Sequence, residues 1–366
     1  MKRGFYIILA AQFFSALADN ALLFAAIALL MQLDAPSWQQ PVLNQFFVFS
    51  YIALAPFVGP FADSLPKGKV MFISNAVKSA GCLAMLIGMH PFYAYGIVGI
   101  GAAMYSPAKY GILTEYLPPQ KLVLANGWME GLTVAAIILG AILGSLLVNP
   151  LLANHYLELF DIPGIETGID TPPEFAISVI LGLYVTAAVF NLYIPKVALD
   201  HKLPKKNVFY ILHDFWHCFK LLWRDPLGQV SLAVTTLFWG VGATLRLIIL
   251  AWAAMALQFG LEKATQLTAV AALGIAIGSV IAAKFVKLEK SVRILPVGIF
   301  MGISLMLMVF ISDLRIAIAL LLIIGAFSGF FIVPMNALLQ HRGHLLMGAG
   351  HSIAVQNFNE NLSILA

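Results

Sequence analysis

The sequence predicts an all-α membrane protein, and three observations support that class. Hydrophobic residues make up 61% of the 366 residues, charged residues only 10%, and the mean hydropathy is +0.92, all far outside the range of soluble domains. Apolar runs of about 20 to 25 residues recur along the chain, each long enough to cross ~30 Å of hydrocarbon as a helix. Runs such as 134–148 and 316–332 do not alternate in polarity, so the spans are expected to be helices and not barrel strands.

The apolar runs predict eleven membrane-spanning helices, at 5–33, 42–65, 69–89, 92–116, 122–149, 175–195, 227–257, 264–287, 293–312, 314–340 and 347–366. The first run follows Met1 closely and lacks a cleavage site, so it is expected to be a span and not a removable leader. Most Lys and Arg residues fall in loops on one side, whereas the other side keeps only Lys263 and Arg315. Since positive loops stay inside, we expect a cytoplasmic N-terminus, as in a multi-pass protein of an inner membrane.

The loop 196–226 separates two predicted domains, a six-helix half at 1–195 and a second half at 227–366. Within this loop, the stretch 207–224 has the period of an amphipathic helix. Its polar face carries His213, His217, Lys220 and Arg224, and its apolar face carries Ile211, Phe215, Cys218, Phe219 and Leu222. We expect the helix to lie along the inner membrane interface. A wetted basic face explains the two histidines better than metal binding, so no metal or cofactor is predicted.

The two halves are predicted to be repeats because polar residues recur at matching depths. The matched sets are Pro107-Ala108-Lys109 with Pro334-Met335-Asn336, and Asn126, Glu130 and Thr133 with Gln356, Glu360 and Ser363. Two complete six-helix repeats would need a longer eleventh span and a twelfth. We therefore expect the second half to be truncated, with its last helix absent from this chain.

Several charged and polar residues fall within the predicted spans. A charge at bilayer depth costs ~2.5 to 3.5 kcal/mol on insertion scales, so such residues mark interior pairs or a substrate path. The candidates for substrate binding are Asp19, Asn20, Lys109, Glu130, Arg246, Gln356, Asn357 and Glu360. Asp19 continues a polar stripe with Gln12 and Ser15 on the first span, and Arg246 continues one on the seventh. Such stripes favour a water-filled central cavity.

Alternative roles for these charges stay open. Asp19 and Arg246 can instead form an interhelical pair, and a pair between two moving halves would also act as a gate. Lys78 in the third span is expected to be structural. Glu130 and Glu360 can carry protons or accept hydrogen bonds from a substrate amine, and the sequence does not decide between these roles.

The segment 59–69 joins the second and third predicted spans. It reads Gly59-Pro-Phe-Ala-Asp63-Ser-Leu-Pro-Lys67-Gly68-Lys69. This resembles the signature of the major facilitator superfamily, Gly-x3-Asp-x3-basic-Gly-basic, with a serine where an arginine usually follows the aspartate. A glycine here permits close helix approach, and the aspartate can cap a helix or pair across an interface. The resemblance implies a major facilitator fold of two six-helix repeats around a central cavity, with an inner gate at Gly59, Asp63, Lys67 and Lys69.

Other stretches resemble a narrower family, the bacterial lysophospholipid transporters. They lie at 11–24, 55–59, 105–113, 125–127, 237–240, 334–340 and 354–357, and the run Ser106-Pro-Ala-Lys-Tyr-Gly111 is the most specific. The resemblance implies movement of lysophosphatidylethanolamine and lysophosphatidylglycerol from the outer to the inner leaflet by alternating access. It also implies a monomer among membrane lipids, with a lysophospholipid acyltransferase system as a candidate partner. The substrate phosphate would suit Arg246 and Lys109, and an amine would suit Asp19, Glu130 or Glu360.

Two other functions are weighed against this one. A proton-coupled exporter of small amphipathic drugs would share the fold, but the fifth span has Gly131, Gly140 and Gly144 without the Gly-Pro pair usual in such exchangers. A non-transporting scaffold for a lipid acyltransferase is the other. ATP-binding and hydrolase motifs are missing, so an enzyme is not expected, and the dispersed basic residues do not suggest nucleic-acid binding.

Overall fold

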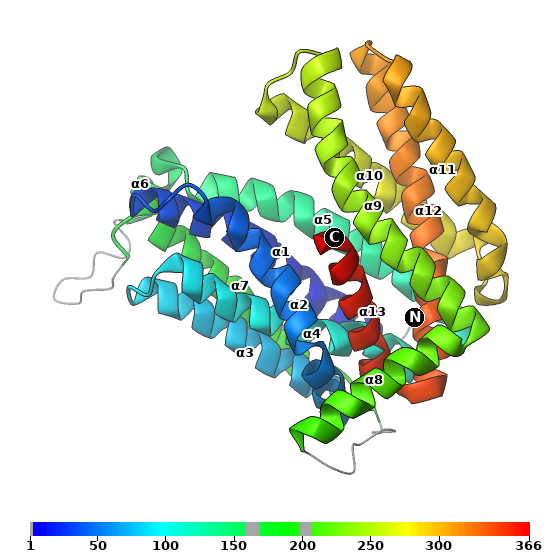
Figure 1. Ribbon diagram of the computed structural model, residues 1–366. Coiled ribbons are helices and arrows are strands. Elements are labelled where there is room, and N and C mark those ends of the chain that lie inside the picture. Colours follow the sequence, from blue (N-terminus) through cyan, green and yellow to red (C-terminus); the bar gives the residue numbers. More distant parts are fainter. Residues whose placement is uncertain (1–2, 158–168, 198–206) are drawn as a thin grey trace. The chain divides into compact units, whose positions relative to one another are not determined.

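The computed structural model describes residues 3–157, 169–197 and 207–366 (Figure 1). These residues form helices and turns and contain no strand, which confirms the all-α class. The helices before the predicted linker are α1 (Arg3–Gln32), α2 (Gln39–Ser64), α3 (Lys67–Leu86), α4 (Pro91–Tyr116), α5 (Leu122–Leu147), α6 (Pro150–Leu157) and α7 (Pro172–Leu192). Those that follow are α8 (Val208–Arg224), α9 (Pro226–Ala256), α10 (Leu261–Phe285), α11 (Leu295–Leu307), α12 (Leu314–Met347) and α13 (Ala349–Leu365). Short 3-10 helices η1 (Pro119–Lys121), η2 (Leu288–Ile294) and η3 (Met308–Phe310) flank α5 and α11.

Nine helices within the described residues are long and apolar enough to cross a membrane. They are α1, α2, α3, α5, α7, α9, α10, α12 and the run formed by α11 with its flanking 3-10 turns. The predicted spans 92–116 and 347–366 form α4 and α13, which are not among the nine. Glycine and tyrosine lower the hydropathy of α4, and α13 has only 17 residues, several of them amides. For these two helices the membrane-spanning assignment stays a prediction.

The chain packs as two compact units whose boundaries cut through three helices. Unit 1 comprises residues 1–109 and 136–215, and unit 2 comprises 110–135 and 216–366. The boundaries therefore fall inside α4, α5 and α8, not at a loop. The division into halves at 1–195 and 227–366 stays a prediction, and residues 198–206 of the predicted linker lie outside the described residues.

Unit 1 is built around α1, which packs along α7, while α3 packs against α7 from another side (Figure 1). Small residues let the second half of α5 approach α1. A Cβ on Gly140 would lie 2.7 Å from the Leu17 carbonyl oxygen, and one on Gly144 would lie 2.7 Å from that of Ala21. Helix association within a bilayer relies on such close packing because lipid supplies no hydrophobic drive. The contacts set the rotation of α1 and so the direction of its polar stripe.

Unit 2 contains an equally close pair, α10 and α12. A Cβ on Gly278 would overlap the backbone carbonyl of Ala326, and one on Gly325 would overlap that of Ala271. The first half of α5 joins the same pair, since a Cβ on Gly127 would lie 2.7 Å from the Ser279 carbonyl oxygen. Glycines thus fix the position of three helices in this unit.

We expect Gly278→Val to disrupt unit 2 because the new side chain meets backbone, which cannot turn away. Overpacking typically costs ~1–3 kcal/mol, and a backbone obstacle lies at the upper end of that range. The thermal midpoint of the detergent-purified variant, followed by size-exclusion elution, measures the loss. Gly302→Val on α11 is the matched control, since no atom lies within 4 Å of its added Cβ. Equal midpoints for the two variants would contradict the packing role of Gly278.

The stretch 207–224 contains α8, and its position at the membrane interface stays a prediction. Phe215, Cys218 and Leu222 of its apolar face are buried, whereas all four residues of its basic face are exposed. The helix ends at Arg224, and α9 begins only two residues later at Pro226. The Asp225 side chain caps α9 by accepting a hydrogen bond of 2.8 Å from the Gly228 amide.

Candidate functional site

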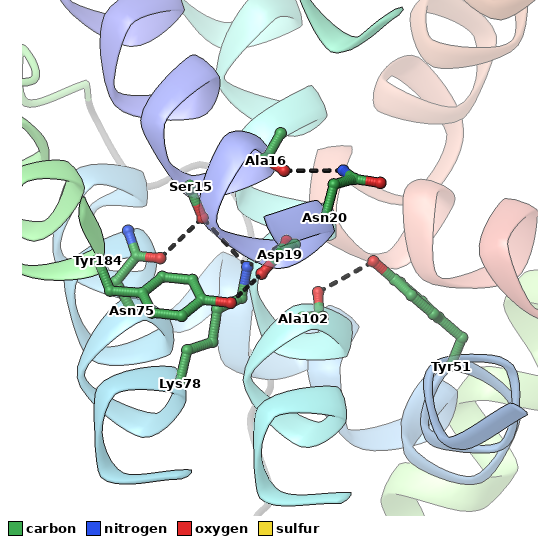
Figure 2. Close-up of polar contacts among 9 residues, drawn as sticks. All are labelled: Ser15, Ala16, Asp19, Asn20, Tyr51, Asn75, Lys78, Ala102 and Tyr184. Atoms are coloured by element: carbon green, nitrogen blue, oxygen red, sulfur yellow. Dashed lines mark hydrogen bonds and ion pairs between the residues drawn. The ribbon is translucent and has the colours of Figure 1, made fainter. Parts of the chain in front are cut away.

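A buried ion pair lies at the centre of unit 1. The Lys78 ammonium on α3 reaches the Asp19 carboxylate on α1, with 2.7 Å between Nζ and Oδ2 (Figure 2). The Tyr184 hydroxyl on α7 donates to the other carboxylate oxygen, Oδ1, also at 2.7 Å. Three helices thus meet at one carboxylate, and both of its oxygens have partners.

The Lys78 ammonium has further partners. It contacts the Ser15 hydroxyl at 3.1 Å, and that hydroxyl donates to the Asn75 side-chain oxygen at 2.8 Å (Figure 2). It also lies 4.8 Å from the centroid of the Tyr105 ring, a favourable distance for a cation over an aromatic face. Lys78 is 1% exposed, which is tolerable for an ammonium only because counter-charge and acceptors surround it.

The Asp19 side chain is more exposed than that of Lys78. It is 21% exposed, although Lys78 and Tyr184 bind both carboxylate oxygens. Gln12 and Ser15 precede it in the predicted polar stripe of α1, and both are buried. Each carboxylate oxygen has more than one lone pair, so Asp19 can accept a further hydrogen bond from a cationic or hydroxyl-bearing group.

The partner of Asp19 within unit 1 is Lys78, which the sequence analysis expects to be structural. Pairing of Asp19 with Arg246 is one of the alternatives left open there. A signal for Lys78 existed, because Ser74 and Asn75 precede it by four and three residues and form a polar stripe on α3. Arg246 belongs to unit 2, so its pairing with Asp19 stays a hypothesis.

Arg246 itself lies on α9 and is exposed. Among the described residues no hydrogen bond or ion pair to its guanidinium is found. The Asn20 amide, by contrast, is used within its own helix, where it donates to the Ala16 carbonyl at 2.8 Å (Figure 2). Arg246 is therefore available for an anionic ligand, whereas the Asn20 side-chain oxygen can accept a hydrogen bond from a donor group.

The residues predicted as a gate surround the turn between α2 and α3. The Lys67 ammonium donates to Asp63 at 2.6 Å and to the Ala62 carbonyl at 2.8 Å, and both charged side chains are buried. Gly68 permits the end of α7 to approach, since its Cβ would lie 2.7 Å from the Asn191 carbonyl oxygen. The signature therefore builds a tight, internally paired turn.

The other two predicted gate residues differ in exposure: Gly59 is buried in α2, and Lys69 is exposed in α3. The gate role of all four residues stays a prediction.

Unit 2 holds a second polar cluster. Asn126 on α5 and Gln340 on α12 exchange two amide hydrogen bonds of 2.9 and 2.8 Å. On α13, the Gln356 amide donates to Asn336 at 3.0 Å and to the Glu360 carboxylate at 2.8 Å. Gln340 is a further member that the sequence did not single out, because a lone amide near a helix end carries no periodic signal.

The remaining predicted substrate residues are all buried. Glu130, Asn357 and Glu360 in unit 2 have exposures of 7 to 8%, and Lys109 in unit 1 has 9%. Pro107 and Pro334 lie inside α4 and α12, two residues before Lys109 and Asn336. A proline inside a helix leaves the backbone carbonyl four residues earlier without its usual donor.

In unit 2 an ion pair joins Asp225 to Arg342 on α12. The guanidinium binds both carboxylate oxygens, with 3.0 Å between Nε and Oδ2. This hydrogen bond holds the pKa of Asp225 below its ordinary value of 3.8. The pair therefore stabilises the fold above the pH range where an unfolded aspartate titrates, and this stability is lost as the pH falls through the lowered pKa.

We expect Asp225→Asn to lower the thermal midpoint at pH 7, because asparagine keeps the helix cap but loses the ionic bond to Arg342. The difference from the wild type should shrink as the pH is lowered below about 4, where the wild-type carboxylate also becomes neutral. Asp313→Asn is the matched control, since Asp313 caps α12 by accepting from the Arg315 and Ile316 amides. A pH-independent difference for Asp225→Asn would show that the ionic bond does not stabilise the protein.

Unit 2 also has an apolar groove of about 570 Å³ between α9, α11 and η3. Its lining includes Leu237, Leu245, Trp252, Met306 and Val309. In the predicted repeat, α9 and α11 correspond to α1 and α3, and α7 covers those two helices in unit 1. The groove thus resembles a surface against which a helix packs, and its apolar lining differs from the polar site.

Comparison with known proteins places the fold. The model of the Major Facilitator Superfamily matches residues 8–365. The human organic anion transporter MFSD10 (TETRAN) has a TM-score of 0.72 at 14% identity, with 100% of this chain and 93% of that chain covered. The E. coli fucose:proton symporter FucP has a TM-score of 0.72 at 14% identity, with coverage of 98% and 89%. At such identities the likeness shows the fold alone.

Relatives of higher sequence identity identify a narrower family within this superfamily. A protein of Yersinia enterocolitica is 44% identical over 367 aligned positions, which cover 100% of this chain and 85% of the relative. A protein of Serratia proteamaculans is 43% identical, with coverage of 100% and 87%. Both carry the name lysophospholipid transporter LplT. Together with the apolar helices, these matches show that the chain is a multi-pass membrane protein that belongs to the bacterial lysophospholipid transporter family of the major facilitator superfamily.

Proposed function

We propose that this protein carries lysophosphatidylethanolamine and lysophosphatidylglycerol from the outer to the inner leaflet of a bacterial inner membrane by alternating access. The names of its relatives support lysophospholipid as the substrate class. The single structural observation that carries the proposal is the Asp19 carboxylate on the apolar helix α1, held by Lys78 and Tyr184 and still 21% exposed. Ionisable residues are rare in membrane spans, which favours a functional role.

The headgroups of these lipids match the polar residues in kind. The phosphate is an acceptor for Arg246 and Lys109, and Arg246 can donate two parallel hydrogen bonds to it. The ethanolamine ammonium is a donor for Asp19, Glu130 or Glu360. The glycerol headgroup has hydroxyls in place of the ammonium, and these can also donate to a carboxylate.

The neutral residues Asn20, Gln356 and Asn357 would complete the headgroup site. An amide can donate to a phosphate oxygen and accept from an ammonium or hydroxyl, so it tolerates both headgroups. The single acyl chain would travel along the apolar surfaces of the spans, which supply no competing polar contacts.

Alternating access requires a closure on each side of the membrane. We assign the inner closure to Gly59, Asp63, Lys67 and Lys69, because the Asp63–Lys67 bond makes the α2–α3 turn a firm unit that can move as one piece. The excess of Lys and Arg in loops on one side supports a cytoplasmic N-terminus. We further propose that the protein acts as a monomer beside a lysophospholipid acyltransferase system.

A second candidate, proton-coupled export of small amphipathic drugs, is favoured by one observation. Glu360 is buried, and the hydrogen bond described for its carboxylate comes from the neutral Gln356 amide. A carboxyl in such surroundings can take up a proton during a transport cycle.

Reconstitution of the purified protein separates these functions. Proteoliposomes receive a fluorescent lysophosphatidylethanolamine in the outer leaflet, and its movement is followed by extraction of the remaining outer lipid with albumin, with and without a proton gradient. Protein-dependent movement without a gradient supports the lysophospholipid carrier. Movement of a fluorescent drug that stops when the gradient is dissipated supports the exporter, and no protein-dependent movement of either solute supports a scaffold.

A further inference from the structure

Helix α8 has three different faces along its length. Phe215, Cys218 and Leu222 form a buried strip. Phe209, Leu212 and Trp216 form an aromatic strip in which Phe209 is 80% exposed and Trp216 is 50% exposed. His213, His217, Lys220 and Arg224 form a basic strip that is exposed throughout and spans about 60° of arc at 100° per residue. The aromatic strip lies between the other two, so an exposed apolar surface borders an exposed cationic one.

The position of α8 puts these strips at the membrane boundary. Asp225 has extended backbone, with φ −73° and ψ 123°, so α8 does not continue the axis of the membrane-spanning α9. The connection is tight, since a Cβ on Gly228 would lie 2.8 Å from the Leu222 carbonyl oxygen. Phe219 packs edge-on against Phe358 of α13, with 6.2 Å between the ring centroids. The second half of α8 is thus fixed to the end of α9.

In the described part of the chain, neighbouring acids do not pair with the basic strip. Among the described residues none of its four side chains forms an ion pair. The acid just beyond the helix, Asp225, is bound by Arg342. Asp214, the acid within α8, lies outside the arc of the strip. The Lys220 ammonium lies 5.8 Å from the centroid of the Trp216 ring, so the basic and aromatic strips meet at this pair.

We infer that α8 is a second lipid-binding surface, which holds anionic diacyl phospholipids at the inner leaflet by their phosphates. The aromatic strip inserts at the level of the headgroups and upper acyl chains, as Trp and Phe do at membrane interfaces. The basic strip then faces the phosphate layer, where each Lys or Arg attracts an anionic surface by about 1 kcal/mol, or roughly fivefold in affinity. This surface shares no residue with the proposed substrate site, and we assign it resident lipid rather than cargo.

Native mass spectrometry of the full chain in detergent tests this inference without any transport assay. Wild-type protein is incubated with phosphatidylglycerol or phosphatidylcholine of the same acyl chains, and the retained lipid is counted. We expect phosphatidylglycerol to be retained at least tenfold more than phosphatidylcholine. Lys220→Gln combined with Arg224→Gln should remove most of this preference, since two charges contribute roughly 20- to 30-fold.

The matched control is Lys287→Gln combined with Lys290→Gln, which removes the same charge from two exposed residues at η2. It should keep the wild-type preference. Equal loss in both double variants would overturn the inference, because net charge and not α8 would then hold the lipid. Displacement of phosphatidylglycerol by millimolar inorganic phosphate would also overturn it, since the site would then bind any free anion.

A second measurement tests the aromatic strip. Phosphatidylglycerol with brominated acyl chains should quench the fluorescence contributed by Trp216, taken as the difference between wild type and Trp216→Phe. An absence of quenching beside intact lipid retention would mean that the lipid lies elsewhere and would reject α8 as the surface.

Discussion

Lys78→Met is expected to reduce lysophospholipid transport to background and to destabilise the protein by up to ~3–5 kcal/mol, the usual cost of removing one partner from a buried ion pair. Asp19→Asn should destabilise at least as much, because Lys78 is 1% exposed and has no access to water once its counter-charge is gone. Transport is measured as uptake into spheroplasts, and stability as the thermal midpoint of purified protein.

The double variant Asp19→Asn with Lys78→Met decides what the pair does. Replacing both partners removes the uncompensated charge, so much of the lost stability should return. Transport should stay at background if the Asp19 carboxylate binds the headgroup. Recovery of transport together with stability would show that the pair only holds α1 to α3 and would reject Asp19 as a substrate residue.

Arg246→Ala is expected to lower transport by about 10- to 100-fold, which corresponds to the ~1.5–3 kcal/mol of a hydrogen bond to a charged group. Its thermal midpoint should stay at the wild-type value, because the side chain is exposed and no described residue pairs with it. Arg246→Lys should give an intermediate rate, since an ammonium supplies the charge without the planar pair of donors.

Substitutions at Asp19 and at Arg246 are expected to reduce transport for different reasons. Loss at Asp19 combines a binding effect with a folding effect, whereas loss at Arg246 should be a binding effect alone. Lys263→Ala, an exposed charge on α10, controls for the change in net charge. Wild-type uptake by Arg246→Ala would remove this residue from the proposed phosphate site.

The sequence alone determined the elements of this protein. In a bilayer every backbone polar group must find a partner inside its own segment, so the length of an apolar run is enough to predict a helix. The ends of α1, α5, α9 and α10 lie within three residues of the predictions for this reason, whereas α12 continues seven residues beyond the predicted end at 340. Helix α8 was predictable from the 3.6-residue period of its apolar face. The motif at 59–69 and the stretch around Lys109 were specific enough to indicate the family.

Only the tertiary structure decided which polar residues meet. Asp19 pairs with Lys78 across 59 residues and with Tyr184 across 165, and Asn126 pairs with Gln340 across 214. Such contacts depend on the rotation and depth of each helix. Those are set by backbone approaches at positions such as Gly140 and Gly278, where a glycine meets the carbonyl of another helix. The sequence shows which side chains are charged. It does not show which side chains pair, because the pairing depends on how neighbouring helices are rotated, and lipid supplies no other partner for a buried charge.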